Sequence, residues 1–179
     1  ISAALERRVF FGDAQRPLHA NQYMLLVGPA GVGKGLVLSE VKRLLSKHYL
    51  YPPEEMKKPA QERKPYIDPT THLPRQQFYC LPDATGFEQI AVEMAGIKTT
   101  YMIENDAVVT ACPAYFCLEE LASLLRPKKS EDVARFLLNM YDNKPYSYKT
   151  LSRGNTFIEH GCLNLIAGTT PDFFEDAEQ

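Results

Sequence analysis

Three residues in the first fifth of the sequence have the spacing of a phosphate-binding loop. Gly28, Gly33 and Lys34 fit the pattern Gly-x-x-x-x-Gly-Lys. Glycines in such a loop let successive backbone N–H groups face an anion, and the lysine adds a positive charge for the β and γ phosphates. A helix beginning at the lysine contributes its partial positive charge. We therefore expect nucleotide contacts from Gly28, Pro29, Ala30, Gly31, Val32, Gly33, Lys34 and Gly35.

Position 35 departs from that pattern. Ser or Thr usually follows the lysine and gives its hydroxyl to Mg²⁺, whereas this chain has Gly35. Ser39 lies a helical turn further on and is not expected to replace that hydroxyl. Because a water molecule can replace this hydroxyl as a Mg²⁺ ligand, we expect nucleotide binding to persist. The missing hydroxyl bears instead on the rate of hydrolysis.

Two adjacent acids follow a second apolar run. Residues 115–118 are apolar and lead directly into Glu119 and Glu120. P-loop ATPases need carboxylates at the end of a neighbouring strand to hold the Mg²⁺ shell and orient the attacking water. We assign Glu119 to the metal and Glu120 to the catalytic general base, with Lys34 as the other catalytic residue. The reverse order of the acids stays open, and the pair could instead begin a helix.

Polar residues follow two further apolar runs. Thr169 and Thr170 are candidates for sensing the γ-phosphate or holding the attacking water, although Thr-Thr-Pro is also an ordinary strand-ending turn. Asp83 and Thr85 could help to bind nucleotide or a DNA strand, although Asp83 could equally cap a helix.

Several basic residues could act between molecules. Arg126 and Arg153 are candidates for an arginine finger on a neighbour's nucleotide, or are simply surface arginines. The formal net charge of -2 gives no overall basic signature, so any nucleic-acid contact must be local. Lys/Arg clusters are often ordinary solvated surface. The basic residues that could contact DNA are Lys57, Lys58, Arg63, Lys64, Arg126, Lys128 and Lys129.

The hydrophobic pattern predicts the elements that must position these residues. Compact apolar runs predict buried strands over 22–27, 77–81, 114–118 and 162–167. Apolar residues at three- and four-residue spacing predict helices over about 1–10, 34–49, 85–96, 121–125 and 130–141. A hairpin is predicted from 99–103 and 107–111, and short strands over 146–150 and 156–159. Strands alternating with helices imply an α/β fold around a mostly parallel sheet.

The length suits a single domain over 1–179, with a proline-rich surface excursion at 51–76. Because the chain lacks an initiator Met, we expect it to be a fragment of a longer protein. No apolar run approaches the roughly 20 residues that a membrane-spanning helix needs, so we expect a cytoplasmic protein without a membrane partner. Cys80, Cys112, Cys117 and Cys162 form no Cys-x-x-Cys pair and are expected to be unpaired, mostly buried thiols.

The order of these segments resembles a known family. Residues 21–27 leading into the loop, 83–85, 118–121, 136–142 and 165–171 are similar to the ATPase core of phage, plasmid and prophage replication proteins, including primase-associated helicases, which was long catalogued as a domain of unknown function. The resemblance implies a three-layer P-loop NTPase, RecA-like or AAA+-like, that uses ATP and Mg²⁺ and assembles into homo-oligomeric rings on DNA. The family usually has Ser or Thr at position 35 and Asp at position 119, where this chain has Gly35 and Glu119.

Three functions follow as hypotheses. The first is an ATP-hydrolysing, helicase-like motor on single- or double-stranded DNA in phage or mobile-element replication, which for a phage protein means the host cytoplasm. The second is a nucleotide-dependent assembly switch with slow turnover, to which Gly35 would be suited. The third is a small-molecule kinase, although a kinase lid normally carries several arginines and few lie in suitable places after Lys34.

Overall fold

The structure, a computed structural model, describes residues 5, 10–11, 18–69, 71–82, 87–102, 108–125, 130–150 and 154–175. Its centre is a four-stranded sheet in the order β3–β8–β5–β4. The strands are β3 (Tyr23–Val27), β4 (Thr99–Met102), β5 (Val108–Leu118) and β8 (Gly161–Thr169). β3, β8 and β5 are parallel, and β4 is antiparallel to β5. The prediction of an α/β fold with a mostly parallel sheet is confirmed.

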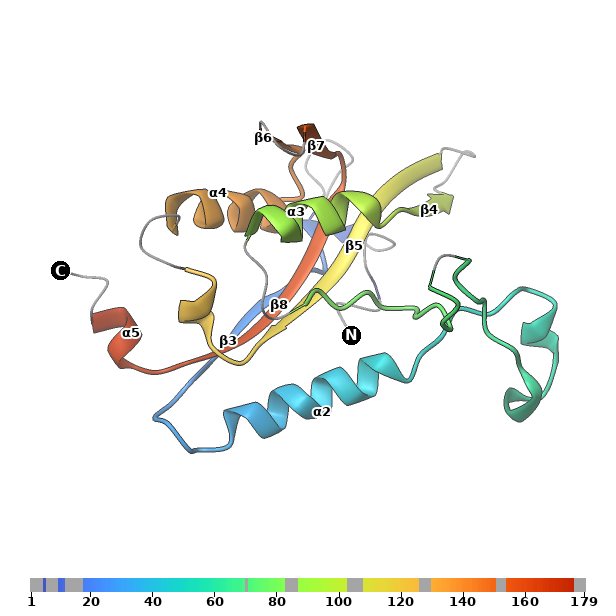
Figure 1. The fold of residues 1–179 in the computed structure, drawn as a ribbon, viewed down its shortest axis with the longest axis horizontal. Coiled ribbons are helices and arrows are strands. Elements are labelled where there is room, and N and C mark those ends of the chain that lie inside the picture. Colours follow the sequence, from blue (N-terminus) through green and yellow to red (C-terminus); the bar gives the residue numbers. More distant parts are fainter. Residues whose placement is uncertain are drawn as a thin grey trace.

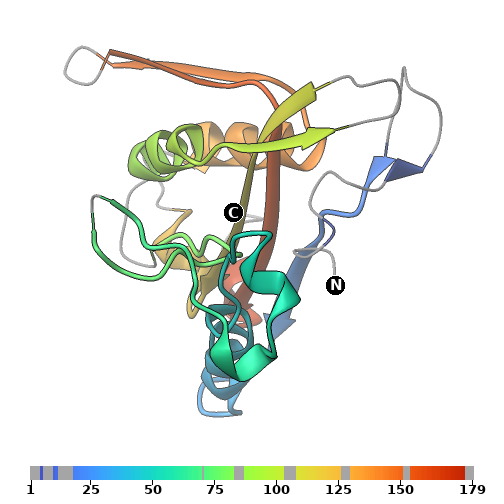
Figure 2. The ribbon, with the colours of Figure 1, turned by 90° about the vertical axis from the view of Figure 1, so that its right-hand side faces the viewer.

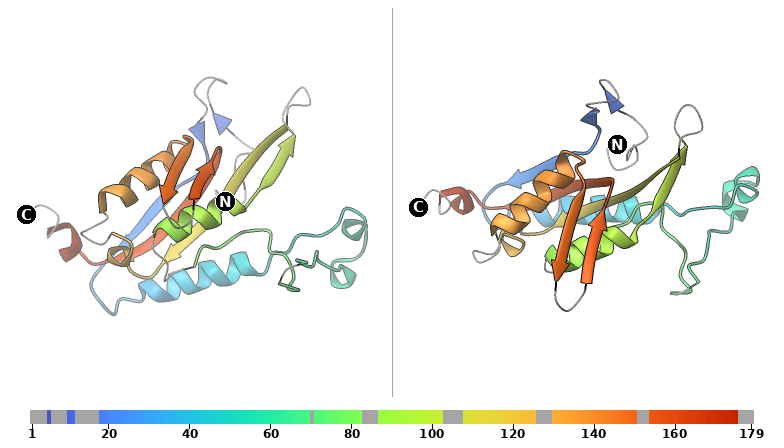
Figure 3. Two further views of the ribbon diagram at one scale, coloured as in Figure 1. Left: turned by 45° about the horizontal axis from the view of Figure 1, so that its top comes forward. Right: turned by 90° about the horizontal axis from the view of Figure 1, so that it is seen from above.

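Helices cover both faces of this sheet (Figures 1 and 3). Helix α2 (Lys34–Ser46) packs on one face, and α3 (Phe87–Gly96) and α4 (Ser130–Tyr141) pack on the other. The β6–β7 hairpin (Tyr146–Thr150 and Gly154–Ile158) forms a separate two-stranded sheet against α3 (Figure 2). The remaining short elements are β1 (Phe10–Phe11), β2 (Leu18–His19), α5 (Asp172–Glu175) and the 3₁₀ turns η1 (Glu55–Lys57), η2 (Ala60–Glu62) and η4 (Leu121–Ser123).

Alternating side chains of the central strands build two hydrophobic clusters. Parallel strands covered on both faces are apolar on both, because each face is removed from water. The larger cluster lies under α3 and α4 and includes Phe116, Leu118, Leu163, Leu165 and Ala167. The smaller lies under α2, where Tyr115, Cys117 and Ile166 meet Val41 and Leu45. Residues on one strand therefore face either α2 or the α3–α4 side.

Pro113 lies inside a continuous strand, where the sequence had predicted two strands separated by a gap. The Cys112 N–H donates to the His160 carbonyl on the β8 side, so the nitrogen of Pro113 faces the opposite side. β4 has already ended there, because its last pair is Thr99 with Ala111. The missing N–H of proline therefore costs no ladder hydrogen bond. Up to Ala111, β5 pairs with β4 on one edge, and from Cys112 onward it pairs with β8 on the other edge.

Several predicted elements are wrong or shorter. Residues 77–81 form no strand: Cys80 makes an isolated bridge with Tyr115, and Pro82 has no N–H to continue the pairing. The predicted helix over 121–125 is reduced to the single turn η4. α2 ends at Ser46 rather than at residue 49, because Tyr49 bridges to Gln76. Most of the predicted helix over 1–10 lies outside the described residues, and Phe10 belongs to β1 instead.

The other predicted elements are confirmed within a few residues. These are β3, α3, the β4–β5 pair, α4, the β6–β7 pair and β8. No disulfide joins any of the four cysteines, which all lie in the described residues, and Cys112, Cys117 and Cys162 are buried as predicted. Burial raises the pKa of the Cys112 thiol, which keeps it protonated. Within the described ranges, no helix combines the length and the apolar character needed to span a bilayer.

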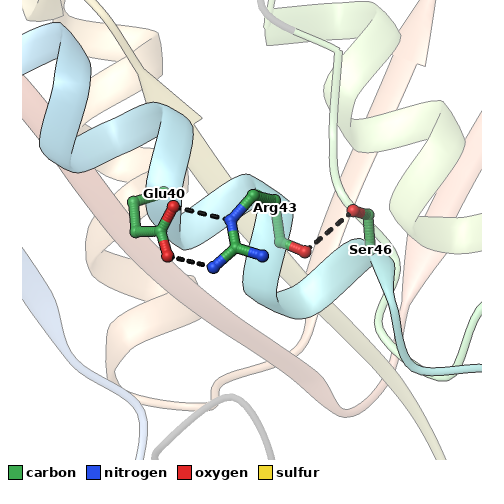
Figure 4. Close-up of polar contacts among 3 residues, drawn as sticks. All are labelled: Glu40, Arg43 and Ser46. Atoms are coloured by element: carbon green, nitrogen blue, oxygen red, sulfur yellow. Dashed lines mark hydrogen bonds and ion pairs between the residues drawn. The ribbon is translucent and has the colours of Figure 1, made fainter.

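The outer surface of α2 carries a charged pair. Arg43 donates to the carboxylate of Glu40 one turn earlier, and the Ser46 hydroxyl donates to the Arg43 carbonyl (Figure 4). The hydrogen bond from Arg43 lowers the pKa of Glu40. Both side chains are half exposed, so solvent screens the pair and it adds little to stability. It marks the face of α2 that points away from the sheet.

Asn21 connects the start of β3 to the end of α4. Its side-chain amide donates to the Tyr141 carbonyl at 2.9 Å and accepts from Asn143 at 3.2 Å. Asn21 is buried and its partners are partly buried, so Asn21→Ala leaves polar groups without this partner and should lower the free energy of unfolding by about 1–3 kcal/mol in urea denaturation. Asn155→Ala, at an exposed site, is the control and should change it by less than about 0.5 kcal/mol. Equal losses in the two variants would contradict this role.

Candidate functional site

The loop between β3 and α2 has a backbone that requires glycine at two positions. Gly31 and Gly33 have φ values of 82° and 88°, in the left-handed region that residues with a Cβ seldom adopt. Gly33 is the N-cap of α2, and no side chain caps the helix there. Several N–H groups at the start of a helix have no partner within it. The loop therefore presents the amino end of α2 to whatever binds at residues 28–35.

Lys34 folds back over the start of this loop. Its ammonium group donates to the carbonyl of Gly28 at 2.6 Å and to that of Pro29 at 2.8 Å. The Gly28 N–H in turn donates to the Thr169 carbonyl at 3.2 Å, which ties the loop to the end of β8. An ammonium on a flexible four-carbon stem can exchange carbonyl oxygens for phosphate oxygens with little movement.

Gly35 is the second residue of α2, and the space beside it is open. A Cβ built on Gly35 would meet no heavy atom within 4 Å. The Ser39 hydroxyl donates to the Gly35 carbonyl at 2.8 Å, so it serves the backbone of its own helix. The loop therefore has room for the missing hydroxyl, and Ser39 is already engaged.

The acidic pair follows the end of β5. Glu119 and Glu120 are both exposed, and Glu120 has an extended backbone before η4. The carbonyl of Glu120 accepts hydrogen bonds from the Ser123 N–H at 3.2 Å and from its hydroxyl at 2.7 Å. The carboxylate of Glu120 does not cap that turn. Glu120 directly precedes η4 as its N-cap residue, so the pair also fits the alternative interpretation, in which it begins a helical turn.

The ends of the three parallel strands bring these groups together. β8 lies between β3 and β5, with Val27 paired to Thr169 and Leu118 to Ala167. A Cβ built on Gly168 would lie 2.5 Å from the Glu119 carbonyl oxygen and 3.7 Å from Cε of Lys34. The chain leaves all three strands at the same end of the sheet (Figure 1). Ligands of open α/β sheets bind at this carboxyl edge.

The two threonines at the end of β8 differ in access. Thr169 is fully buried, and its hydroxyl is 3.5 Å from the Thr170 carbonyl. Strand alternation places the Thr169 side chain on the α3–α4 face with Ala167, whereas Gly168 shares the α2 face with Ile166. Thr170 is half-buried beyond the strand end, so it is the more accessible of the two candidates.

Other predicted residues lie elsewhere. Within the proline-rich excursion, Lys58 pairs with Glu55 at 2.7 Å, and Arg63 donates to the backbone carbonyls of Lys58 and Met56. This excursion follows the end of α2 opposite the loop, roughly 20 Å away by helix rise (Figure 1). Asp83, Thr85, Arg126, Lys128, Lys129 and Arg153 lie outside the described residues.

Carboxylate chemistry at the strand ends fits a magnesium ion shared with phosphate. Mg²⁺ typically takes one or two carboxylates and completes its shell with water and phosphate oxygens. Glu119 and Glu120 can supply that number. Among the described residues, no group of three or more His, Cys, Asp or Glu side chains could hold a metal by itself. A cation bound here would therefore depend on the phosphates for part of its coordination.

The carboxyl edge of the sheet thus combines a glycine-shaped loop, a lysine and two exposed carboxylates. Gly168, at the centre of this edge, was not identified from the sequence. The sequence feature that could have pointed to Gly168 is a glycine directly before the two threonines at the end of an apolar run. The same feature is also found in ordinary turns. No protein-family model matches this chain, and no curated protein matches it either.

Proposed function

We propose that this chain is a P-loop ATPase domain with the three-layer fold of the RecA-like or AAA+-like type. The observation that carries the proposal is the meeting of Lys34, Gly168 and the Glu119 backbone at the carboxyl edge of the sheet, beside a loop with two left-handed glycines. Phosphate needs N–H donors and a cation, and its hydrolysis needs carboxylates nearby. All of these groups follow the carboxyl ends of parallel strands in one sheet.

Each group has a role in hydrolysis. The N–H groups of the loop bind the β and γ phosphates, and Lys34 exchanges the carbonyls of Gly28 and Pro29 for phosphate oxygens. Glu119 would hold Mg²⁺, which neutralises charge on the phosphates when bound. Glu120 accepts a proton from the attacking water while the water oxygen bonds to the γ-phosphorus. The bond between the γ-phosphorus and the β–γ bridging oxygen breaks, and ADP leaves. Thr170 is accessible for orienting that water.

We propose a helicase-like motor on DNA as the biological setting, acting as a homo-oligomeric ring. The resemblance to replication ATPases supports it. The expected result is that single-stranded DNA raises the ATP hydrolysis rate of the protein at least several-fold in a phosphate-release assay. Binding of ATP with no effect of DNA on turnover would contradict the motor. Transfer of phosphate to a nucleoside or sugar would indicate a kinase instead.

Gly35 favours one second candidate, a nucleotide-dependent assembly switch with slow turnover. Without a hydroxyl at position 35, the protein has one ligand fewer for Mg²⁺ than the usual motif. The switch predicts that ATP changes the oligomeric state, measured by light scattering, at concentrations where hydrolysis is negligible. Oligomerisation that requires turnover would argue against it.

Replacing Gly35 with Ser tests the missing hydroxyl directly. The site has open space, and Ser suits the first turn of a helix better than Gly, so the variant should fold at least as well as the parent. We expect the ATP hydrolysis rate to rise roughly tenfold and the half-saturating Mg²⁺ concentration to fall, since a direct ligand replaces water. Gly35→Ala is the matched control and should leave both unchanged. Equal behaviour of the two variants would show that the hydroxyl is not needed.

A further inference from the structure

Gly168 has a closer neighbour than a side chain at that position would allow. A Cβ there would lie 2.5 Å from the carbonyl oxygen of Glu119 and 3.5 Å from its carbonyl carbon. These are backbone atoms, so no side-chain rotation can relieve the contact. Residue 168 must therefore lack a side chain for β5 to end where it does.

Hydrogen bonds hold the chain on both sides of this contact. The next residue of β8, Thr169, accepts the Gly28 N–H through its carbonyl, which ties β8 to the phosphate loop. On the other side, the carbonyl of Glu120 is held by Ser123. A side chain at position 168 would therefore force the Glu119 backbone and β8 apart. It would also come within 3.7 Å of Cε of Lys34, an ordinary contact.

We propose that Gly168 is a positioning residue, which holds the Glu119–Glu120 pair beside Lys34 so that all three act on the same phosphate. The proposal rests on the proposed ATPase function. It assigns to Gly168 no contact with nucleotide. Its effect is transmitted through the backbone of Glu119, and it should therefore alter the carboxylate-dependent steps and spare those that depend on the loop alone.

Gly168→Ala tests the proposal, with Gly161→Ala as the matched control. Gly161 lies at the other end of the same strand, and a Cβ there crowds the Met140 side chain and Ile158. Both variants should lower the melting temperature. For Gly168→Ala, we expect nucleotide affinity in EDTA to stay within about threefold, the half-saturating Mg²⁺ concentration to rise about tenfold, and turnover per folded molecule to fall 10- to 100-fold. Gly161→Ala should keep the parent values of all three.

Three results would overturn the inference. The first is parent-like turnover and Mg²⁺ dependence in Gly168→Ala, and the second is an equal loss of turnover in Gly161→Ala. The third is full additivity of Gly168→Ala with Glu119→Gln, because a residue that positions the acidic pair should lose part of its effect when the Glu119 carboxylate is absent. Failure of the proposed ATPase function is distinguishable from failure of this inference. In that case the unchanged protein itself binds no ATP.

A second variant covers the case in which Gly168→Ala does not fold. Ser123→Ala, at an exposed position, removes the hydroxyl that holds the Glu120 carbonyl at 2.7 Å. If the acidic pair must be held in place, this variant should lower turnover several-fold with unchanged nucleotide affinity in EDTA. Unchanged turnover in Ser123→Ala, together with an unfolded Gly168→Ala, would reduce Gly168 to a folding role and overturn the proposal.

Discussion

Replacing Lys34 with Ala is expected to weaken ATP binding by about 10–100-fold and to abolish measurable hydrolysis. The ammonium group is the only side-chain cation described at the loop, and its two carbonyl contacts are weaker partners than a phosphate. A hydrogen bond between charged groups contributes about 1.5–3 kcal/mol, which corresponds to that loss of affinity. Binding is measured by calorimetry or with a fluorescent ATP analogue.

Lys47→Ala is the matched control for this experiment. Lys47 is exposed and lies directly after the other end of α2, so its removal changes the net charge equally without touching the loop. We expect its ATP affinity to stay within about twofold of the parent, since distant surface charges are screened. Parent-like affinity in Lys34→Ala would show that the ammonium group does not contact the phosphates of ATP. The proposed nucleotide site would then lose its basis.

Replacing Glu120 with Gln is expected to preserve ATP binding and to lower the hydrolysis rate by roughly 10²–10⁴-fold. Gln keeps the shape of the side chain and cannot accept the proton of the attacking water, and general-base catalysis contributes about that factor. The measurement is single-turnover hydrolysis of radiolabelled ATP, because it separates chemistry from product release.

Glu119→Gln distinguishes the two acids. If Glu119 holds the cation, its variant should raise the half-saturating Mg²⁺ concentration, whereas Glu120→Gln should leave that concentration unchanged. Glu159→Gln, an exposed glutamate before β8, controls for the loss of charge and should behave as the parent. The opposite pattern for Glu119 and Glu120 would reverse their roles, which the sequence left open, and normal hydrolysis in Glu120→Gln would exclude it as the base.

The parts of the fold with strong local signals were predictable from the sequence. The apolar run before Gly28 and the three- and four-residue spacing after Gly33 identified β3 and α2, because a parallel strand and an amphipathic helix have different periods. The long apolar run ending at Thr169 identified β8 in the same way. The loop between β3 and α2 could be located because its glycines and lysine are close together in the chain.

Features that depend on distant partners could not be predicted in this way. Pro113 indicates a strand break unless β4 is known to end beside it. Residues 77–81 have the composition of a strand but obtain only one bridge in the described sheet, because β4 takes the start of the same edge of β5. The role of Gly168 depends on the Glu119 carbonyl, which is about fifty residues away in sequence and belongs to another strand.

The pairing of β3 with β8 has a consequence for the order in which the protein folds. Tyr23 pairs with Leu165, and Gln22 donates to Asn164 across 142 residues. Closing so large a loop lowers the entropy of the chain before the stabilising contacts form, and contacts of this kind slow folding. During synthesis, β3 must wait until β8, about 142 residues later, has been made before it gains its neighbour. We therefore expect the proposed nucleotide affinity to appear last in refolding, after α3 and α4 have packed on β5.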